Sequence, residues 1–148
     1  MLLRIFILLL LPIYLYSQNF TGEVNYSGQT ESGTIQVIST GYGTNKTNAQ
    51  VHAEKNALEA ILFRGIPGSQ QSKPIIPDQE TSKKLHSDYF TSLFDSDHYK
   101  IFIMESSPLT SFKKRNKQMK NLDVIIKLNI TSLISELELK NIIRPFGF

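Results

Sequence analysis

A nine-residue alternation near the C-terminal end constrains the fold of this chain more than any other feature. Every second residue from position 122 to position 130 is a large aliphatic one: Leu122, Val124, Ile126, Leu128 and Ile130. Successive side chains of a β-strand point to opposite faces of a sheet, so the pattern predicts a strand with one buried face and one solvated face. A sheet of this kind needs a second layer to cover its apolar face.

The predicted cover is a long helix over residues 46–64. Four alanines recur at spacings of four, four and three residues, which places them on one side of a helix. They are Ala49, Ala53, Ala57 and Ala60. Small side chains at a contact allow a helix to lie close to its neighbour. Thr44 or Asn45 is the predicted N-cap, and Gly65 followed by Pro67 is expected to end the helix.

Four further elements complete the predicted fold. They are a β-branched strand over residues 34–40 that ends in a turn at 41–43, a helix over 81–94, a strand over 99–104, and a short helix capped by Thr131 that runs to Leu139. We expect the strands 99–104 and 122–130 to form an antiparallel hairpin, joined by the polar residues 106–118. The prediction is an α+β fold: a two-layer sandwich in which a small, mainly antiparallel sheet of about three to four strands has helices packed on one face.

The N-terminal residues predict export. Arg4 supplies a positive charge ahead of an apolar run from Ile5 to Tyr16, and Ser17 offers a small residue at a cleavage point. This is the three-part layout of a secretory signal peptide. A membrane span needs about 20 apolar residues, and this shorter run contains Pro12, so we expect cleavage and no retained transmembrane helix. The mature protein is then expected in the periplasm, at the outer membrane or in the medium.

The length of the chain, 148 residues, suits one domain and not two. We expect a signal peptide over residues 1–17, a flexible lead-in over 18–32, and a single α+β domain over 33–148. The lead-in is rich in Gly, Ser, Thr and Asn, and it holds one short candidate edge strand at residues 23–26. Hydrophobic residues make up 41% of the chain and charged residues 20%, which is typical of a globular protein rather than a disordered one.

Composition excludes several kinds of chemistry. The chain has no cysteine, so it holds no disulfide, no thiolate metal site, no cysteine nucleophile and no lipid-modified N-terminal cysteine. Its net charge of +3 is too weak a bias to predict a nucleic-acid partner. No motif predicts a cofactor.

Three groups of residues resemble chemical sites, and each has a simpler structural interpretation. Residues 41–46 stand between a strand and a helix, as a phosphate-binding loop does, but the glycine and lysine spacing of such loops is missing, which favours a turn and a helix cap. Residues 95–98 begin like a calcium loop without its later ligands, which favours a solvated turn. His52 and His86 lack a second ligand at metal-site spacing. The chain is therefore interpreted as a non-enzyme. A hydrolase whose serine and histidine come together only in the folded chain remains an alternative.

The clearest binding signal is a basic run on the loop of the predicted hairpin, formed by Lys113, Lys114 and Arg115 with Lys117 and Lys120. Such a run either keeps a loop tip solvated or contacts an acidic partner, anionic headgroups or polyanionic glycans. The predicted partner-contact residues combine this run with aromatic and flanking positions. They are Tyr42, Phe63, Arg64, Lys113, Lys114, Arg115, Phe146 and Phe148.

Two functions follow from these patterns. The first is an exported, non-enzymatic module of the cell envelope or the medium that acts through protein–protein contact, with another envelope protein or assembly as its partner. The alternative is a small-ligand or carbohydrate-binding protein of the envelope. Its pocket would need walls from residues 66–80 or from the basic hairpin loop, because only these segments are long enough.

The segment Ile35–Ala60 carries a resemblance to a known family. An extended stretch, the residues Gly41-Tyr42-Gly43, a polar cap and the alanine-striped helix resemble the small periplasmic module shared by the FlgT amino-terminal domain and related small outer-membrane lipoproteins, and more distantly the TolB amino-terminal domain. The later strands Tyr99–Met104 and Leu122–Ile130 are compatible with that module. The resemblance implies an envelope-located, non-enzymatic module that docks onto larger assemblies, and it transfers no functional residues. The lipid anchor is not carried over, because the chain has no cysteine.

A second resemblance covers most of the predicted mature chain. The segment Leu62–Gly68 and the closing residues Arg144–Phe148 are similar to a set of uncharacterised exported proteins from Gram-negative bacteria. This resemblance implies export and no particular activity.

Overall fold

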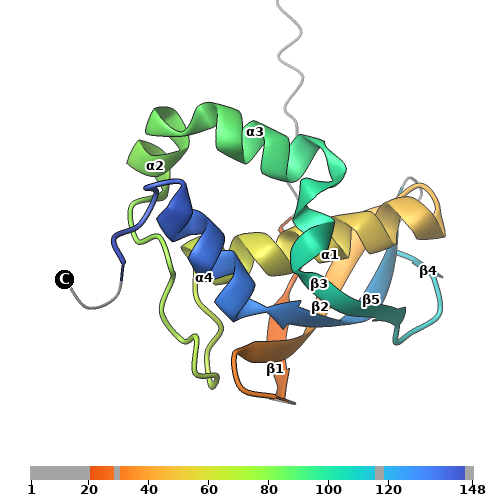
Figure 1. Cartoon of the computed structure of the whole chain (residues 1–148). Coiled ribbons are helices and arrows are strands. Elements are labelled where there is room, and N and C mark those ends of the chain that lie inside the picture. Colours follow the sequence, from red (N-terminus) through yellow and green to blue (C-terminus); the bar gives the residue numbers. More distant parts are fainter. Residues whose placement is uncertain (1–20, 29–30, 116–118, 146–148) are drawn as a thin grey trace, which may run out of the picture.

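The computed structural model describes residues 21–28, 31–115 and 119–145. The predicted signal peptide, and Phe146 and Phe148 among the predicted contact residues, lie outside this part of the chain. The described strands form one antiparallel five-stranded sheet in the order β1-β2-β5-β3, with β4 also paired to β5 (Figure 1). Their bounds are β1 Val24–Gly28, β2 Thr34–Gly43, β3 Ile103–Pro108, β4 Lys113–Lys114 and β5 Lys120–Asn129.

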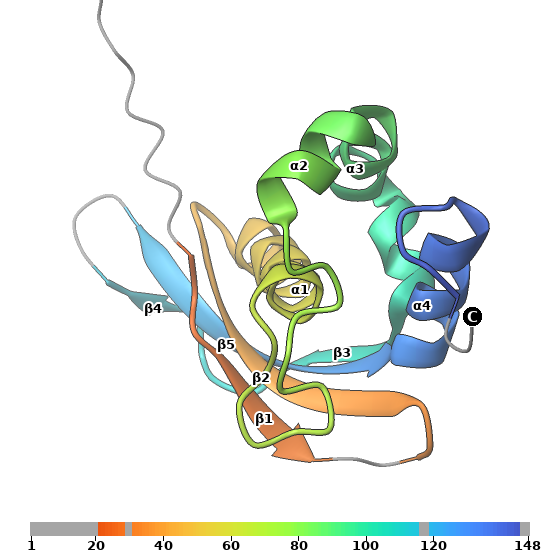
Figure 2. The same ribbon diagram turned by 90° about the vertical axis from the view of Figure 1, so that its left-hand side faces the viewer.

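The helices all lie on one side of this sheet. They are α1 Lys46–Phe63, α2 Gln79–Leu85, α3 Ser87–Asp95 and α4 Ile130–Leu139, together with the 3₁₀ helix η1 Asp97–Phe102. Figure 2 shows α1, seen end-on, next to the sheet and α2 and α3 farther from it. The predicted α+β fold, with an antiparallel sheet and helices on one face, is therefore confirmed. Among the residues that the structure describes, no helix is both long and apolar enough to cross a membrane.

The centre of the sheet is the long antiparallel pair of β2 and β5. It runs in unbroken register from Thr34 opposite Asn129 to Gly43 opposite Lys120. The inward positions of β5 predicted from the alternation are all buried: Leu122, Val124, Ile126 and Leu128. They face α1 and form the core with it. The expected antiparallel hairpin is present as the pair β3–β5.

The alanine stripe brings α1 very close to β2. Ala49, Ala53 and Ala57 are completely buried, and Gly41 lies beneath Ala49 and Ala53. A Cβ atom on Gly41 would lie 1.9 Å from the carbonyl oxygen of Ala49, so only glycine fits at this position. Of the two candidate N-caps, Asn45 is the one that caps α1, through its side chain and the backbone N–H of Asn48.

Three predicted boundaries in the first half of the chain were wrong or incomplete. Residues 41–43 are not a turn, because β2 continues to Gly43 and its glycines receive the first turns of α1. The candidate edge strand at residues 23–26 is present as β1, which pairs with β2 and extends to Gly28, so the predicted flexible lead-in was too long. The predicted helix over 81–94 is two helices, because the chain breaks at His86 and leaves Leu85 72% exposed.

Two boundaries in the second half also differ. Residues 97–102 form η1 and not a strand, and β3 begins only at Ile103. A 3₁₀ helix has three residues per turn, so Tyr99 and Phe102 point the same way and are both buried. The N-cap of the last helix is Asn129, not Thr131, since β5 leads directly into α4.

Candidate functional site

The sheet register gathers the basic run and Tyr42 at one corner of the molecule. Lys113 of β4 is opposite Asn121 of β5, and Asn121 is opposite Tyr42 of β2, so the three residues form one cross-strand row. Lys114, Lys120 and Gly43 form the next row in the same way. Figure 1 shows β4 and β5 meeting at this corner, where α1 also begins.

Five exposed cations of the described residues define this cationic corner: Lys46, Lys113, Lys114, Arg115 and Lys120. Lys117 of the predicted basic run lies outside the described part of the chain. Two of them lie over aromatic rings. The guanidinium carbon of Arg115 is 4.7 Å from the centre of the Tyr42 ring, and Nζ of Lys120 is 5.1 Å from that of Phe112. Contacts of this kind attract the cation and limit its freedom. The sequence has no Asp or Glu in residues 41–50 or 109–122, so the corner presents concentrated positive charge.

Two other predicted contact residues lie elsewhere. Phe63 is only 8% exposed and packs against Phe90, with ring centres 5.6 Å apart, so it belongs to the core. Arg64 is exposed, and its guanidinium donates to Oδ1 of Asn56 at 2.9 Å. Both residues stand at the C-terminal end of α1, about 27 Å from the helix start for 18 residues. The structure therefore joins Tyr42 to Lys113, Lys114 and Arg115 but not to Phe63 or Arg64.

A polar hollow of about 500 Å³ opens between α1 and the pair α2–α3. One face of α1 forms its floor through residues spaced i, i+3, i+4 and i+7: His52, Lys55, Asn56 and Glu59. Asn56 is buried, and its Nδ2 donates to the carbonyl oxygen of Gly22 at 2.8 Å. This bond ties the segment before β1 to the helix beside the hollow.

The opposite wall of the polar hollow comes from the helices beyond α1. Lys83 of α2, and Phe94 and Asp95 of α3, line it, and Nζ of Lys83 forms an ion pair with Oε1 of Glu59 at 3.2 Å. Sequence reasoning missed this site because its residues come from four separate segments: the residues before β1 and the helices α1, α2 and α3. Only the i, i+3, i+4 and i+7 spacing of polar residues on the predicted helix was visible in advance.

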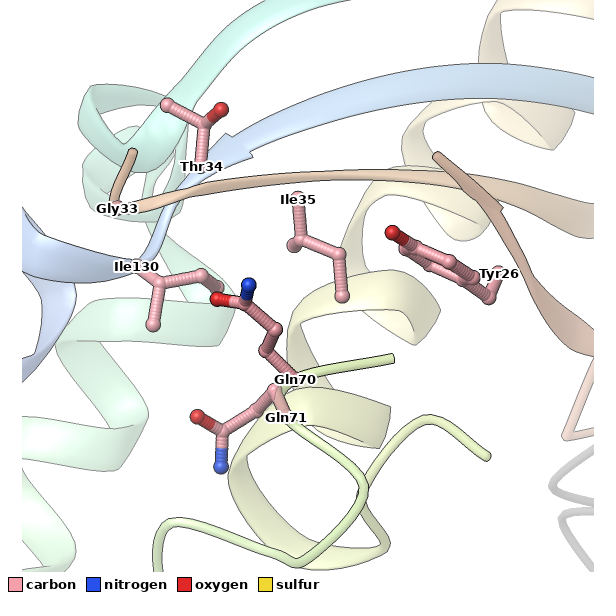
Figure 3. A pocket seen from close by; sticks show the side chains of 7 residues that line it. All are labelled: Tyr26, Gly33, Thr34, Ile35, Gln70, Gln71 and Ile130. Carbon is pink, nitrogen blue, oxygen red and sulfur yellow. The ribbon is translucent and has the colours of Figure 1, made fainter. Parts of the chain in front are cut away.

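A smaller pocket of about 180 Å³ lies at the end of the sheet opposite the cationic corner, where β2 begins (Figure 3). Figure 3 shows Ile35, Ile130 and the ring of Tyr26 around it, with Gln70 reaching in from the connection between α1 and α2. The residues 66–80 of this connection were predicted as a possible pocket wall. The connection follows Gly65, whose φ of 76° suits glycine. The volume is below the roughly 300 Å³ at which small-molecule sites begin, so it suits one side chain rather than a whole ligand.

A buried carboxylate joins α1 to η1 and β3. Glu54 accepts hydrogen bonds from the hydroxyls of Ser106 at 2.6 Å and Tyr99 at 3.2 Å, and from the amide of Gln50 at 3.3 Å. Burial raises the pKa of Tyr99, and the neighbouring Glu54 carboxylate raises that pKa further. Each carboxylate oxygen has a donor, as a buried polar group requires. The network connects elements of the fold through fully bonded groups. No sequence pattern predicted it.

His98 and Asp97, from the turn predicted at residues 95–98, also make contacts that hold the fold together. Nε2 of His98 lies 2.7 Å from Oε1 of Glu136 and so joins η1 to α4, while Asp97 pairs with Lys100. Burial and the Glu136 carboxylate raise the pKa of Tyr89, which stacks edge-on against the His98 ring. Within the described ranges, no group of three or more His, Asp or Glu residues is placed to hold a metal ion.

Comparison with known proteins gives no relative: no family model, curated protein or solved structure matches the chain. The resemblance to the FlgT-type periplasmic module therefore stays a prediction, and the function has to be argued from the sites themselves.

Proposed function

We propose that this chain is an exported, non-enzymatic module that acts by protein–protein contact, binding an acidic segment of a cell-envelope partner at its cationic corner. The supporting observation is the concentration of charge. The five exposed cations of the corner exceed the net charge of +3 of the whole chain, so the rest of the chain is net acidic. Such an asymmetric field orients an oppositely charged partner and speeds its association.

The aromatic rings of the corner support the same proposal. Tyr42 and Phe112 hold Arg115 and Lys120 in place, so less side-chain freedom is lost when these cations meet a carboxylate. An arginine can also bind a carboxylate through two parallel hydrogen bonds, which adds specificity. A corner with several cations, formed by segments 41–50 and 109–122 that contain no Asp or Glu, is suited to this purpose.

The test is an affinity pulldown from cell-envelope extract with the tagged protein that begins at Gln18. Wild type is compared with Lys113→Glu/Lys114→Glu, and the matched control is Lys73→Glu/Lys84→Glu, which makes the same charge change at exposed lysines away from the corner. We expect wild type and control to retain one stoichiometric partner, which salt releases, and the corner variant to lose it. Equal retention by all three proteins would contradict the proposal.

A further inference from the structure

We propose that the polar hollow between α1 and α2–α3 is a binding site for a neutral saccharide. Its volume of about 500 Å³ lies within the range of small-molecule sites, roughly 300–1,000 Å³. The site is distinct from the cationic corner and does not depend on the function proposed for that corner.

The charges around the hollow favour an uncharged ligand. The residues that line it include two lysines, Lys55 and Lys83, and two acids, Glu59 and Asp95. An anion would meet both carboxylates, and a cation would meet both ammonium groups. A ligand without net charge avoids either repulsion.

The same four groups suit a ligand that carries many hydroxyls. An ammonium only donates hydrogen bonds and a carboxylate only accepts them, whereas a hydroxyl does both. A sugar can therefore satisfy both kinds of wall residue at once, and hydrogen bonds to charged groups are the stronger ones. An apolar ligand would cover these charged groups without offering them a hydrogen bond, at a cost in free energy.

Phe94 supplies an aromatic surface of this wall, and Nζ of Lys83 lies 6.0 Å from the centre of its ring. It stands beside Asp95 at the end of α3 and is partly buried against the core, so its ring is held in position. An aromatic ring next to a carboxylate can cover the C–H face of a sugar ring while the carboxylate binds its hydroxyls. The pocket of Figure 3 lacks this combination and is too small for a sugar.

Contacts within the protein connect the walls of the hollow to one another. The Lys83–Glu59 ion pair connects α2 to α1, and the bond from Asn56 to Gly22 fixes the segment that enters β1. Nζ of Lys83 also lies 4.7 Å from the centre of the Phe63 ring. A preformed site does not lose affinity to the ordering of its own groups.

The proposal is tested by NMR titration of the ¹⁵N-labelled protein with glucose, N-acetylglucosamine and maltose, each to about 50 mM, well above a Kd of about 1 mM. We expect saturable shifts of the backbone amides of residues 52–59 and 94–95 with at least one sugar. Inorganic phosphate and spermidine serve as charged probes and should cause no such shifts. The absence of saturable shifts with all three sugars, or stronger shifts at these residues with either charged probe, would overturn the proposal.

Variants separate the hollow from nonspecific binding. Glu59→Gln and Asp95→Asn each remove one carboxylate and should raise the Kd by about tenfold. Asp88→Asn makes the same change at an exposed position on α3 outside the hollow, and it should bind as wild type does. Both hollow variants change solvent-accessible side chains, so the fold should persist. Amide signals far from the hollow that match those of the wild-type NMR spectrum verify this. Equal affinity of the hollow variants and wild type would also overturn the proposal.

Discussion

Substitution of Gly41 by alanine should disrupt the contact on which the whole two-layer arrangement depends. The added Cβ would lie 1.9 Å from the carbonyl oxygen of Ala49 and 2.7 Å from the backbone nitrogen of Ala53. Both atoms belong to the backbone of α1, so no side chain can turn aside to make room. Ordinary contact begins near 3.4 Å, and α1 would have to move away from β2 by roughly 1.5 Å.

The size of the effect follows from that displacement. A gap of about 0.5–1 Å already removes a quarter to a half of the attraction between packed atoms, and this gap is larger. Overpacking of a core costs about 1–3 kcal/mol, and we expect the upper end of this range, about 3 kcal/mol, because the clash is with backbone. That is a large share of the stability of a typical domain, about 5–15 kcal/mol.

Urea unfolding followed by circular dichroism measures the loss, and Gly68→Ala is the matched control. Gly68 has a φ of 82°, but a Cβ there meets no atom within 4 Å. Its substitution should cost only the strain of the left-handed conformation, about 1 kcal/mol. With a slope of about 2 kcal/mol per molar urea, the midpoints of the two variants should differ by about 1 M. A Gly41→Ala protein as stable as the Gly68→Ala control would refute the close-packing argument.

Two further predictions concern the buried polar groups. Because burial raises the pKa of Tyr99 above the value of about 10 for an unfolded tyrosine, the folded chain keeps this proton at a pH where the unfolded chain releases it. Stability should therefore fall as the pH rises above about 10, by at most about 1.4 kcal/mol per pH unit for Tyr99, and Tyr89, whose pKa is raised in the same way, adds a loss of its own. Urea unfolding between about pH 9 and 11 checks this, and a Tyr99→Phe protein with an equally steep loss would contradict it. Glu54→Ala should cost about 3 kcal/mol in thermal or urea unfolding, because it leaves the buried hydroxyl of Tyr99 and the half-buried hydroxyl of Ser106 without their acceptor. Glu54→Gln keeps one carbonyl oxygen and should cost less, so equal losses for the two variants would count against the network.

The sequence predicted the elements whose hydrophobic period is long and regular. The alternation from Leu122 to Leu128 and the alanine stripe of α1 each repeat often enough to exclude the other kind of element. Short apolar runs do not have this property. The run at 99–104 has the aromatic and β-branched composition of a strand, but only the core could decide that Tyr99 and Phe102 should share one face of a 3₁₀ turn.

Glycine was ambiguous for a physical reason. It is found both where the chain turns and where two backbones approach closely, and a sequence does not distinguish the two. Residues 41–43 were predicted as a turn, whereas Gly41 and Gly43 lie in β2 under the start of α1. Gly65 was predicted correctly as the residue that ends α1, because Pro67 cannot continue the helix and a glycine just before it is typical of a helix end.

The candidate sites also differ in how far the sequence could predict them. Lys113, Lys114 and Arg115 are consecutive, so their clustering needed no fold, but the addition of Tyr42 depended on the register of three strands. The polar hollow depends on the angle between α1 and α2–α3, which no local pattern specifies. A contact between distant segments is set by tertiary packing, and for that reason the hollow was absent from the predicted sites.

One side chain links the two proposed sites. His52 lines the polar hollow, and its Nδ1 accepts a hydrogen bond from the backbone N–H of Tyr42 at 3.4 Å, with the two rings 5.8 Å apart. Tyr42 in turn carries Arg115 over its ring. A ligand that reorients His52 therefore acts on the ring that positions a cation of the corner. Thermodynamic linkage requires that such an effect be reciprocal, so a partner bound at the corner must change the affinity for the ligand in the hollow by the same factor.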